Sequence, residues 1–114
     1  MFVFSDVRSK TAAVGETVHL QCGAFVSLGT YVDWHHKRPS DTRPRQIIAG
    51  GRLANGDFDG RLNISGSTLF ISDVQINDAG IYTCVKRSGQ GMLHHISLFV
   101  HGNSAAEIFH HLFK

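Results

Sequence analysis

The chain has 114 residues, of which 42% are hydrophobic and 18% are charged. This length suits a single domain, and the hydrophobic share allows a packed core and excludes wholesale disorder. The formal net charge of +2 neither demands a nucleic-acid partner nor excludes an acidic one. No apolar run approaches the roughly 20 residues that span a bilayer. The opening residues lack the features of a signal peptide, so we expect either a mature extracellular domain or a cytosolic protein.

Strand signals recur along the chain as short segments of alternating hydrophobicity, over residues 16–22, 30–36, 61–65, 67–74 and 92–100. Loops rich in Gly, Pro, Ser and Asn separate these segments. The side chains expected to face inward are Val18, Leu20, Cys22, Val32, Trp34, His36, Leu62, Ile64, Leu69, Ile71, Ile96, Leu98 and Val100. Seven or more short strands of this kind predict an all-β fold, a two-sheet antiparallel β-sandwich.

Residues 103–114 differ in character from the rest of the chain. Ile108, Phe109, Leu112 and Phe113 have helical spacing there, although a helix this short is marginal by itself. We therefore assign residues 1–102 to the domain and residues 103–114 to a C-terminal tail or stalk.

Two cysteines, Cys22 and Cys84, lie 62 positions apart in apolar segments with strand character. A metal site would want further ligands close by, in a spacing such as Cys-x-x-Cys. A single long-range disulfide is the favoured interpretation, and it implies an oxidising compartment.

The stretch DAGIYTC, residues 78–84, places Asp78, Gly80, Tyr82 and Cys84 at every second position, and Trp34 follows the first cysteine by twelve positions. This arrangement resembles the Cys, Trp and Asp-x-Gly-x-Tyr-x-Cys pattern of the immunoglobulin superfamily, over roughly residues 3–101. The resemblance implies an immunoglobulin β-sandwich with one inter-sheet disulfide.

In that fold Trp34 and Leu69 belong to the core, and the hydroxyl of Tyr82 bonds the backbone at the corner before its strand. The distance between the cysteines leaves room for strands C′, D and a short C″, as in variable-type (V-set) domains. Arg61 and Asp78 match the ion pair at the bottom of such domains, and the alternative is two solvated charges. Either way their role is structural.

Two departures separate the chain from antigen receptors. Residues 92–95 do not match the Phe/Trp-Gly-x-Gly motif of their last strand, and Lys37 stands where paired variable domains carry Gln. The resemblance therefore favours a V-type domain of the non-rearranging receptor or adhesion-molecule kind.

Eight histidines raise the question of a metal site or of catalysis. Adjacent residues on a strand point to opposite faces, and His35 and His95 would be separated by an intervening strand, at about twice the 4.8 Å strand spacing. We recognise no Ser or Cys beside a base that a third group holds. We expect no metal, no cofactor and no enzyme activity.

The segment Asn63-Ile64-Ser65 is an N-glycosylation acceptor. Asn63 alternates with the inward Leu62 and Ile64, so we expect it to face solvent. A glycan there would cover the sheet of strands D, E and B and direct recognition to the opposite sheet or to the loop tips.

The resemblance implies binding through the outward face of strands G, F, C and C′, with either Ile47 or Ile48 contributing from C′. The further residues expected on this face are Asp33, His35, Lys37, Thr83, Val85, Arg87, His95, Ser97 and Phe99. The loop between strands F and G would add Lys86, Ser88, Gly89, Gln90 and Gly91.

The expected partner is another protein, either a second copy of the chain in a homodimer or a separate ligand. The basic run of Lys37, Arg38, Arg43 and Arg45 makes an anionic glycan a weaker alternative, and it lacks the aromatic residues that would stack on nucleic acid. We predict a cell-surface or secreted recognition module, attached to a membrane only through an anchor outside this sequence. The alternatives are an intracellular immunoglobulin domain of a filament protein and an antigen-receptor-like variable domain.

Overall fold

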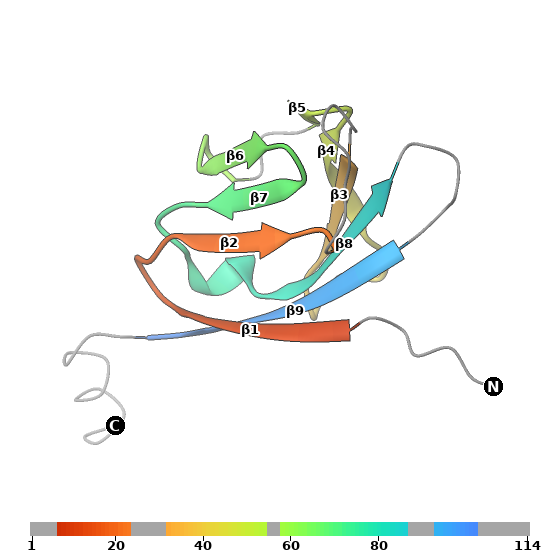
Figure 1. Ribbon diagram of the computed structural model, residues 1–114. Coiled ribbons are helices and arrows are strands. Elements are labelled where there is room, and N and C mark those ends of the chain that lie inside the picture. The colour runs from red at the N-terminus through yellow and green to blue at the C-terminus, as the bar shows by residue number, and fades with distance from the viewer. Residues whose placement is uncertain (1–6, 24–31, 55–57, 87–92, 103–114) are drawn as a thin grey trace, which may run out of the picture.

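The computed structural model describes residues 7–23, 32–54, 58–86 and 93–102. Within these ranges the strands are β1 (Val7–Ala13), β2 (Val18–Gln21), β3 (Val32–Lys37), β4 (Arg45–Ala49), β5 (Arg52–Leu53), β6 (Leu62–Ser65), β7 (Thr68–Ile71), β8 (Gly80–Lys86) and β9 (Leu93–His101), with a short 3₁₀ helix, η1 (Ile76–Asp78), before β8 (Figure 1). Among the residues described, no helix is long and apolar enough to cross a membrane.

The strands form two layers, a six-stranded sheet in the order β1-β9-β8-β3-β4-β5 and a three-stranded sheet in the order β2-β7-β6. The predicted two-sheet, all-β sandwich is confirmed. One pairing departs from the prediction of antiparallel sheets, because β1 runs parallel to β9. These strands are distant in the sequence, and no short turn joins them that would force the antiparallel direction.

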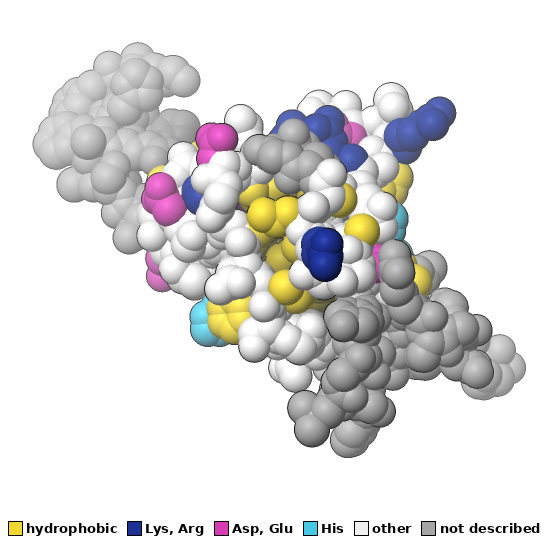
Figure 2. All heavy atoms as spheres, turned by 90° about the horizontal axis from the view of Figure 1, so that it is seen from above, with side chains coloured by type: hydrophobic (Ala, Val, Ile, Leu, Met, Phe, Trp, Pro, Cys, Tyr) yellow, Lys and Arg dark blue, Asp and Glu magenta, His cyan; other side chains and the backbone are white. Residues whose placement is uncertain are grey.

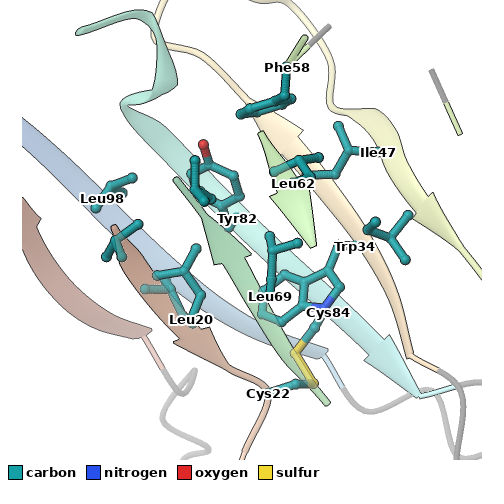
Figure 3. Packing of buried hydrophobic residues seen from close by; sticks show 14 of the residues in the cluster. Leu20, Cys22, Trp34, Ile47, Phe58, Leu62, Leu69, Tyr82, Cys84 and Leu98 are labelled. Atoms are coloured by element: carbon teal, nitrogen blue, oxygen red, sulfur yellow. A yellow bond between two sulfur atoms is a disulfide. The ribbon is translucent and has the colours of Figure 1, made fainter. Parts of the chain in front are cut away.

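The inward faces of the two sheets meet in one core, as the alternation of the sequence predicts (Figure 3). Trp34 and Leu69 are fully buried there, and Trp34 lies beside the bridge between Cys22 and Cys84. This bridge confirms the predicted disulfide: it joins the residue after β2 to the middle of β8, across the two sheets, with Cα atoms 5.9 Å apart.

Arg61 and Asp78 form an ion pair at the bottom of the sandwich. Nη1 of Arg61 donates to Oδ2 of Asp78 at 2.6 Å, and Nη2 donates to Oδ1 at 2.9 Å. The hydrogen bond to Asp78 raises the pKa of the Arg61 guanidinium. The backbone of the same aspartate accepts the hydroxyl of Tyr82 at 2.5 Å, so side chain and main chain of Asp78 together anchor the corner that leads into β8.

The edge of β2 that faces β1 is covered by basic side chains rather than by a strand. Nζ of Lys10 donates to the His19 carbonyl oxygen at 2.6 Å, and Nη2 of Arg8 donates to the Gln21 carbonyl oxygen at 2.5 Å. Charged groups that occupy edge carbonyls oppose strand addition by another chain.

Candidate recognition face

The outward face of the larger sheet is ordered in rows by the antiparallel pairing of β3, β8 and β9. In the middle row His35 lies opposite Thr83, which lies opposite His95. The hydroxyl of Thr83 and Nδ1 of His95 share a hydrogen bond of 2.8 Å. The two histidines are thus on the same face with a strand between them, as the sequence predicts. In the described part of the chain, no group of three or more His, Cys, Asp or Glu side chains could hold a metal ion.

The next row on the same outward face includes one exposed hydrophobic side chain and lies beside another. Lys37 lies opposite Ile81, which lies opposite Ser97. Phe99 is two residues beyond Ser97 and therefore diagonal to Ile81 on the same face. Phe99 is 58% exposed and Ile81 is 43% exposed, and together with Lys37 they line a hollow of about 280 Å³.

We call the outward side chains of β3, β8 and β9 the recognition face. Its described members are Asp33, His35, Lys37, Ile81, Thr83, Val85, His95, Ser97 and Phe99, each of which is half-buried or exposed. Of the other expected residues, Arg87, Ser88, Gly89, Gln90 and Gly91 lie outside the described residues. Lys86 ends β8, but its side chain is not among those described.

The prediction that Ile47 or Ile48 points outward from β4 is wrong, because both side chains are buried. The pairing of β3 with β4 shifts between Trp34 and His35: Trp34 lies opposite Ile48, while His35 lies opposite Gln46. Ile47 is the extra residue in this irregularity, which allows two successive residues to face the core. Gln46, paired with the outward His35, takes the outward position on β4.

Ile81 was not predicted to lie on the recognition face, although the alternation of the sequence indicates this position. Residues 80–86 alternate, so an assignment of Thr83 and Val85 to the outward face carries Ile81 with them. A β-branched side chain at such a position is easily read as core, and only its exposure separates the two interpretations.

The basic loop after β3 is partly neutralised within the domain. Oδ2 of Asp41 accepts a hydrogen bond from the Arg38 backbone N–H at 2.9 Å, and Oδ1 lies 3.8 Å from Nη2 of Arg45. The backbone hydrogen bond from Arg38, and the positive charges nearby, lower the pKa of the Asp41 carboxyl. This pairing weakens the case for an anionic glycan as ligand.

A second apolar area lies on the side of the sandwich where the outer strands β5 and β6 are found. Figure 2 looks down on this side and shows hydrophobic side chains at its centre, with Lys and Arg side chains beside them. Leu53 on β5 is 54% exposed. Among the described residues of β5 and β6, Leu53 is the one large hydrophobic residue that is exposed. Soluble domains commonly expose a small apolar area of this kind, so this side does not define a second site.

Comparison with known proteins identifies the family. The immunoglobulin domain model matches residues 8–91. The Ig kappa chain V region 3368 of Oryctolagus cuniculus is 41% identical over 80 residues, which is 67% of this chain and 71% of that protein. Ig kappa chain V region 120 of the same species is 39% identical over 80 residues, or 67% of this chain and 73% of that protein. The chain belongs to the immunoglobulin domain family, and its domain is of the V type.

Solved structures with the same fold include adhesion molecules. The N-terminal eight Ig domains of Down Syndrome Cell Adhesion Molecule match with a TM-score of 0.65 and 24% identity, over 84% of this chain and 11% of that chain. The N-terminal four Ig domains of Dscam1 isoform 4.44 match with a TM-score of 0.65 and 23% identity, over 86% of this chain and 23% of that chain. The present chain therefore spans less than a quarter of either structure, and the likeness is one of fold.

Proposed function

We propose that this domain binds a protein partner through the recognition face, as a module of a cell-surface or secreted protein. The observation that carries the proposal is the exposed apolar pair of Ile81 and Phe99 beside the hollow that Lys37 also lines. Interfaces combine such apolar anchors with polar groups around them, and the row of His35, Thr83 and His95 supplies the polar part.

The extracellular location in this proposal is supported by the disulfide between Cys22 and Cys84, since such bridges persist in oxidising compartments. The same bridge argues against the alternative of an intracellular filament domain. Domains of this family present surfaces to partners, so we propose no catalytic role.

Sedimentation velocity of the oxidised chain, from micromolar to hundred-micromolar concentration, tests whether the partner is a second copy. The variants are Lys37→Glu and Phe99→Glu on the recognition face. Ile76→Glu is the matched control, because Ile76 is 52% exposed on η1 and lies outside that face. A dimer that both face variants weaken, and the control does not, indicates homophilic binding.

A strict monomer would direct the search to a separate protein. Tetramers of the domain would then be used to stain cells, with the same three variants. Staining lost with Phe99→Glu and kept with Ile76→Glu supports the recognition face. A dimer or a staining signal that is indifferent to both face variants would overturn the proposal.

A second candidate is an antigen-receptor-like variable domain that pairs with another variable domain. The 41% identity to a rabbit kappa V region favours it. Lys37, which stands at the position of the pairing Gln in such domains, argues against it. If pairing with another variable domain is the function, Lys37→Gln strengthens association; in the recognition module that we propose first, it does not.

A further inference from the structure

We propose that Asn63 carries an N-linked glycan whose first sugar packs on the ring of Phe70. The acceptor segment Asn63-Ile64-Ser65 lies on β6, an edge strand of the three-stranded sheet. Asn63 and Ser65 are exposed, whereas Ile64 points inward and packs against the core. The folded domain therefore leaves the acceptor side chains accessible and needs no rearrangement to accommodate a sugar.

The local hydrogen bonding of Asn63 suits this modification. Its Oδ1 accepts a hydrogen bond from the Ile64 backbone N–H at 2.9 Å. Its Nδ2, the atom that would bear the sugar, has no hydrogen-bond partner within the described ranges. In the reaction Nδ2 loses a proton and bonds to C1 of the first N-acetylglucosamine, and the diphosphate of the lipid-linked oligosaccharide donor departs.

Phe70 lies directly across from the acceptor. The antiparallel register places Asn63 opposite Phe70, and Phe70 opposite His19 on β2. The rings of Phe70 and His19 have centroids 4.6 Å apart, with planes inclined by 58°. The row Asn63, Phe70, His19 thus carries an aromatic pair on the solvent side of the sheet, beside the side chain to which the glycan would be attached.

Packing on Phe70 follows from distance and from the nature of the two surfaces. Directly opposed residues of an antiparallel pair have Cβ atoms about 4.5–5.5 Å apart, so a sugar on Asn63 begins within reach of the ring. Phe70 is only half-buried, and a pyranose presents an apolar C–H face that can cover the rest of its ring. The glycan would then lie over the outward face of β2, β7 and β6. This is the sheet opposite the recognition face, so the inference does not depend on which surface binds a partner, but it rests on the secreted or cell-surface location in the proposed function.

The modification is tested by secreting the full chain from mammalian cells behind a supplied leader. Asn63-Ile64-Ser65 is the single Asn-x-Ser/Thr in the sequence, so one substitution removes the site. We expect the native chain and Ser65→Thr to lose mass on treatment with peptide N-glycosidase, and Ser65→Ala to show no change. A native chain that is secreted and folded, but carries no glycan, would overturn the proposal.

The packing on Phe70 is tested by NMR of the glycosylated domain. An aromatic ring beneath the first sugar shifts the proton resonances of that sugar upfield. Phe70→Leu, which keeps an apolar side chain, should abolish this shift. His19→Ala is the matched control, because it removes the neighbouring ring and leaves Phe70 in place. If the sugar resonances are the same in the native and Phe70→Leu domains, the contact with Phe70 is wrong.

Discussion

The imidazole ring of His36 stacks on the phenol ring of Tyr82, with centroids 4.2 Å apart and planes inclined by 14°. His36 is fully buried on the inward side of β3, and its Nε2 is hydrogen-bonded to the Ala79 carbonyl oxygen at 3.0 Å. Because a carbonyl oxygen only accepts, Nε2 carries the proton. The buried Nδ1 has no hydrogen-bond partner in the part of the chain that the structure describes, and it is then unprotonated. The fold therefore selects one tautomer of the neutral ring.

This environment predicts that the domain loses stability in weak acid. Burial lowers the pKa of His36 below its usual value of 6.5, although the hydrogen bond to Ala79 acts in the opposite direction. Below pH 6.5 the unfolded chain takes up a proton at this position that the folded chain does not. The free energy of unfolding therefore falls by up to about 1.4 kcal/mol per pH unit, until the pKa of the folded state is reached.

Urea unfolding of the native chain and of His36→Phe, from about pH 7.5 to about pH 5, measures this contribution. His36→Phe keeps a ring against Tyr82 but cannot titrate, so its stability should depend less on pH in this range. The comparison removes the contribution of the other histidines, which both chains share. If the free energy of unfolding depends equally on pH in the two chains, His36 does not cause the loss of stability in weak acid.

Arg61 is predicted to stabilise the fold because of the carboxylate that it neutralises. The side chain of Asp78 is only 4% exposed, and that of Arg61 is 18% exposed. Arg61→Leu would leave this carboxylate with the Gln75 backbone N–H, at 2.8 Å, as its described donor. Removal of one partner of a buried pair costs about 3 kcal/mol, which the midpoint of urea unfolding would report.

Arg43→Leu is the matched control for Arg61→Leu, since Arg43 is exposed in the loop before β4. We expect it to change the free energy of unfolding by no more than about 0.5 kcal/mol. If the two variants lose similar amounts of unfolding free energy, the ion pair with Asp78 is not the reason that Arg61 stabilises the fold.

The two layers of the fold could be predicted from the sequence because hydrophobic residues recur at every second position. This is the spacing of side chains on one face of a β-strand. Val18, Leu20 and Cys22 alternate with polar residues, and only one choice of face buries them. The ion pair at the bottom of the sandwich could be predicted for a different reason. Arg61 and Asp78 occupy the positions that form this pair in V-type domains, which the sequence resembles.

Contacts between strands that are distant in the sequence could not be obtained in this way. The shift in register between β3 and β4 buries both Ile47 and Ile48, and nothing in the local sequence fixes where it falls. The alternation does place His36 on the inward face, but its stacking on Tyr82 depends on the register of β3 with β8, which pairs these two residues. These contacts depend on the register in which the strands pair, and a single sequence does not determine that register.

Gly80 is predicted to be required where β8 begins. Its φ is +133°, a backbone conformation that residues with a side chain rarely adopt. A Cβ at this position would overlap the carbonyl oxygen of Lys37, a main-chain atom that cannot rotate away. Gly80→Ala therefore has to displace β8 from β3, and we expect it to cost about 3 kcal/mol in urea unfolding.

Gly66→Ala separates the overlap at Gly80 from the strain of the backbone alone. Gly66 also has a positive φ, of +59°, but a Cβ there would meet nothing within 4 Å. Its substitution should cost only the strain of left-handed backbone, about 1 kcal/mol. Because the overlap at Gly80 is with Lys37, we also expect Gly80→Ala to disturb the recognition face, which Gly66→Ala should leave intact. Equal destabilisation by the two variants would show that the approach of β3 to Gly80 is not a constraint on the fold.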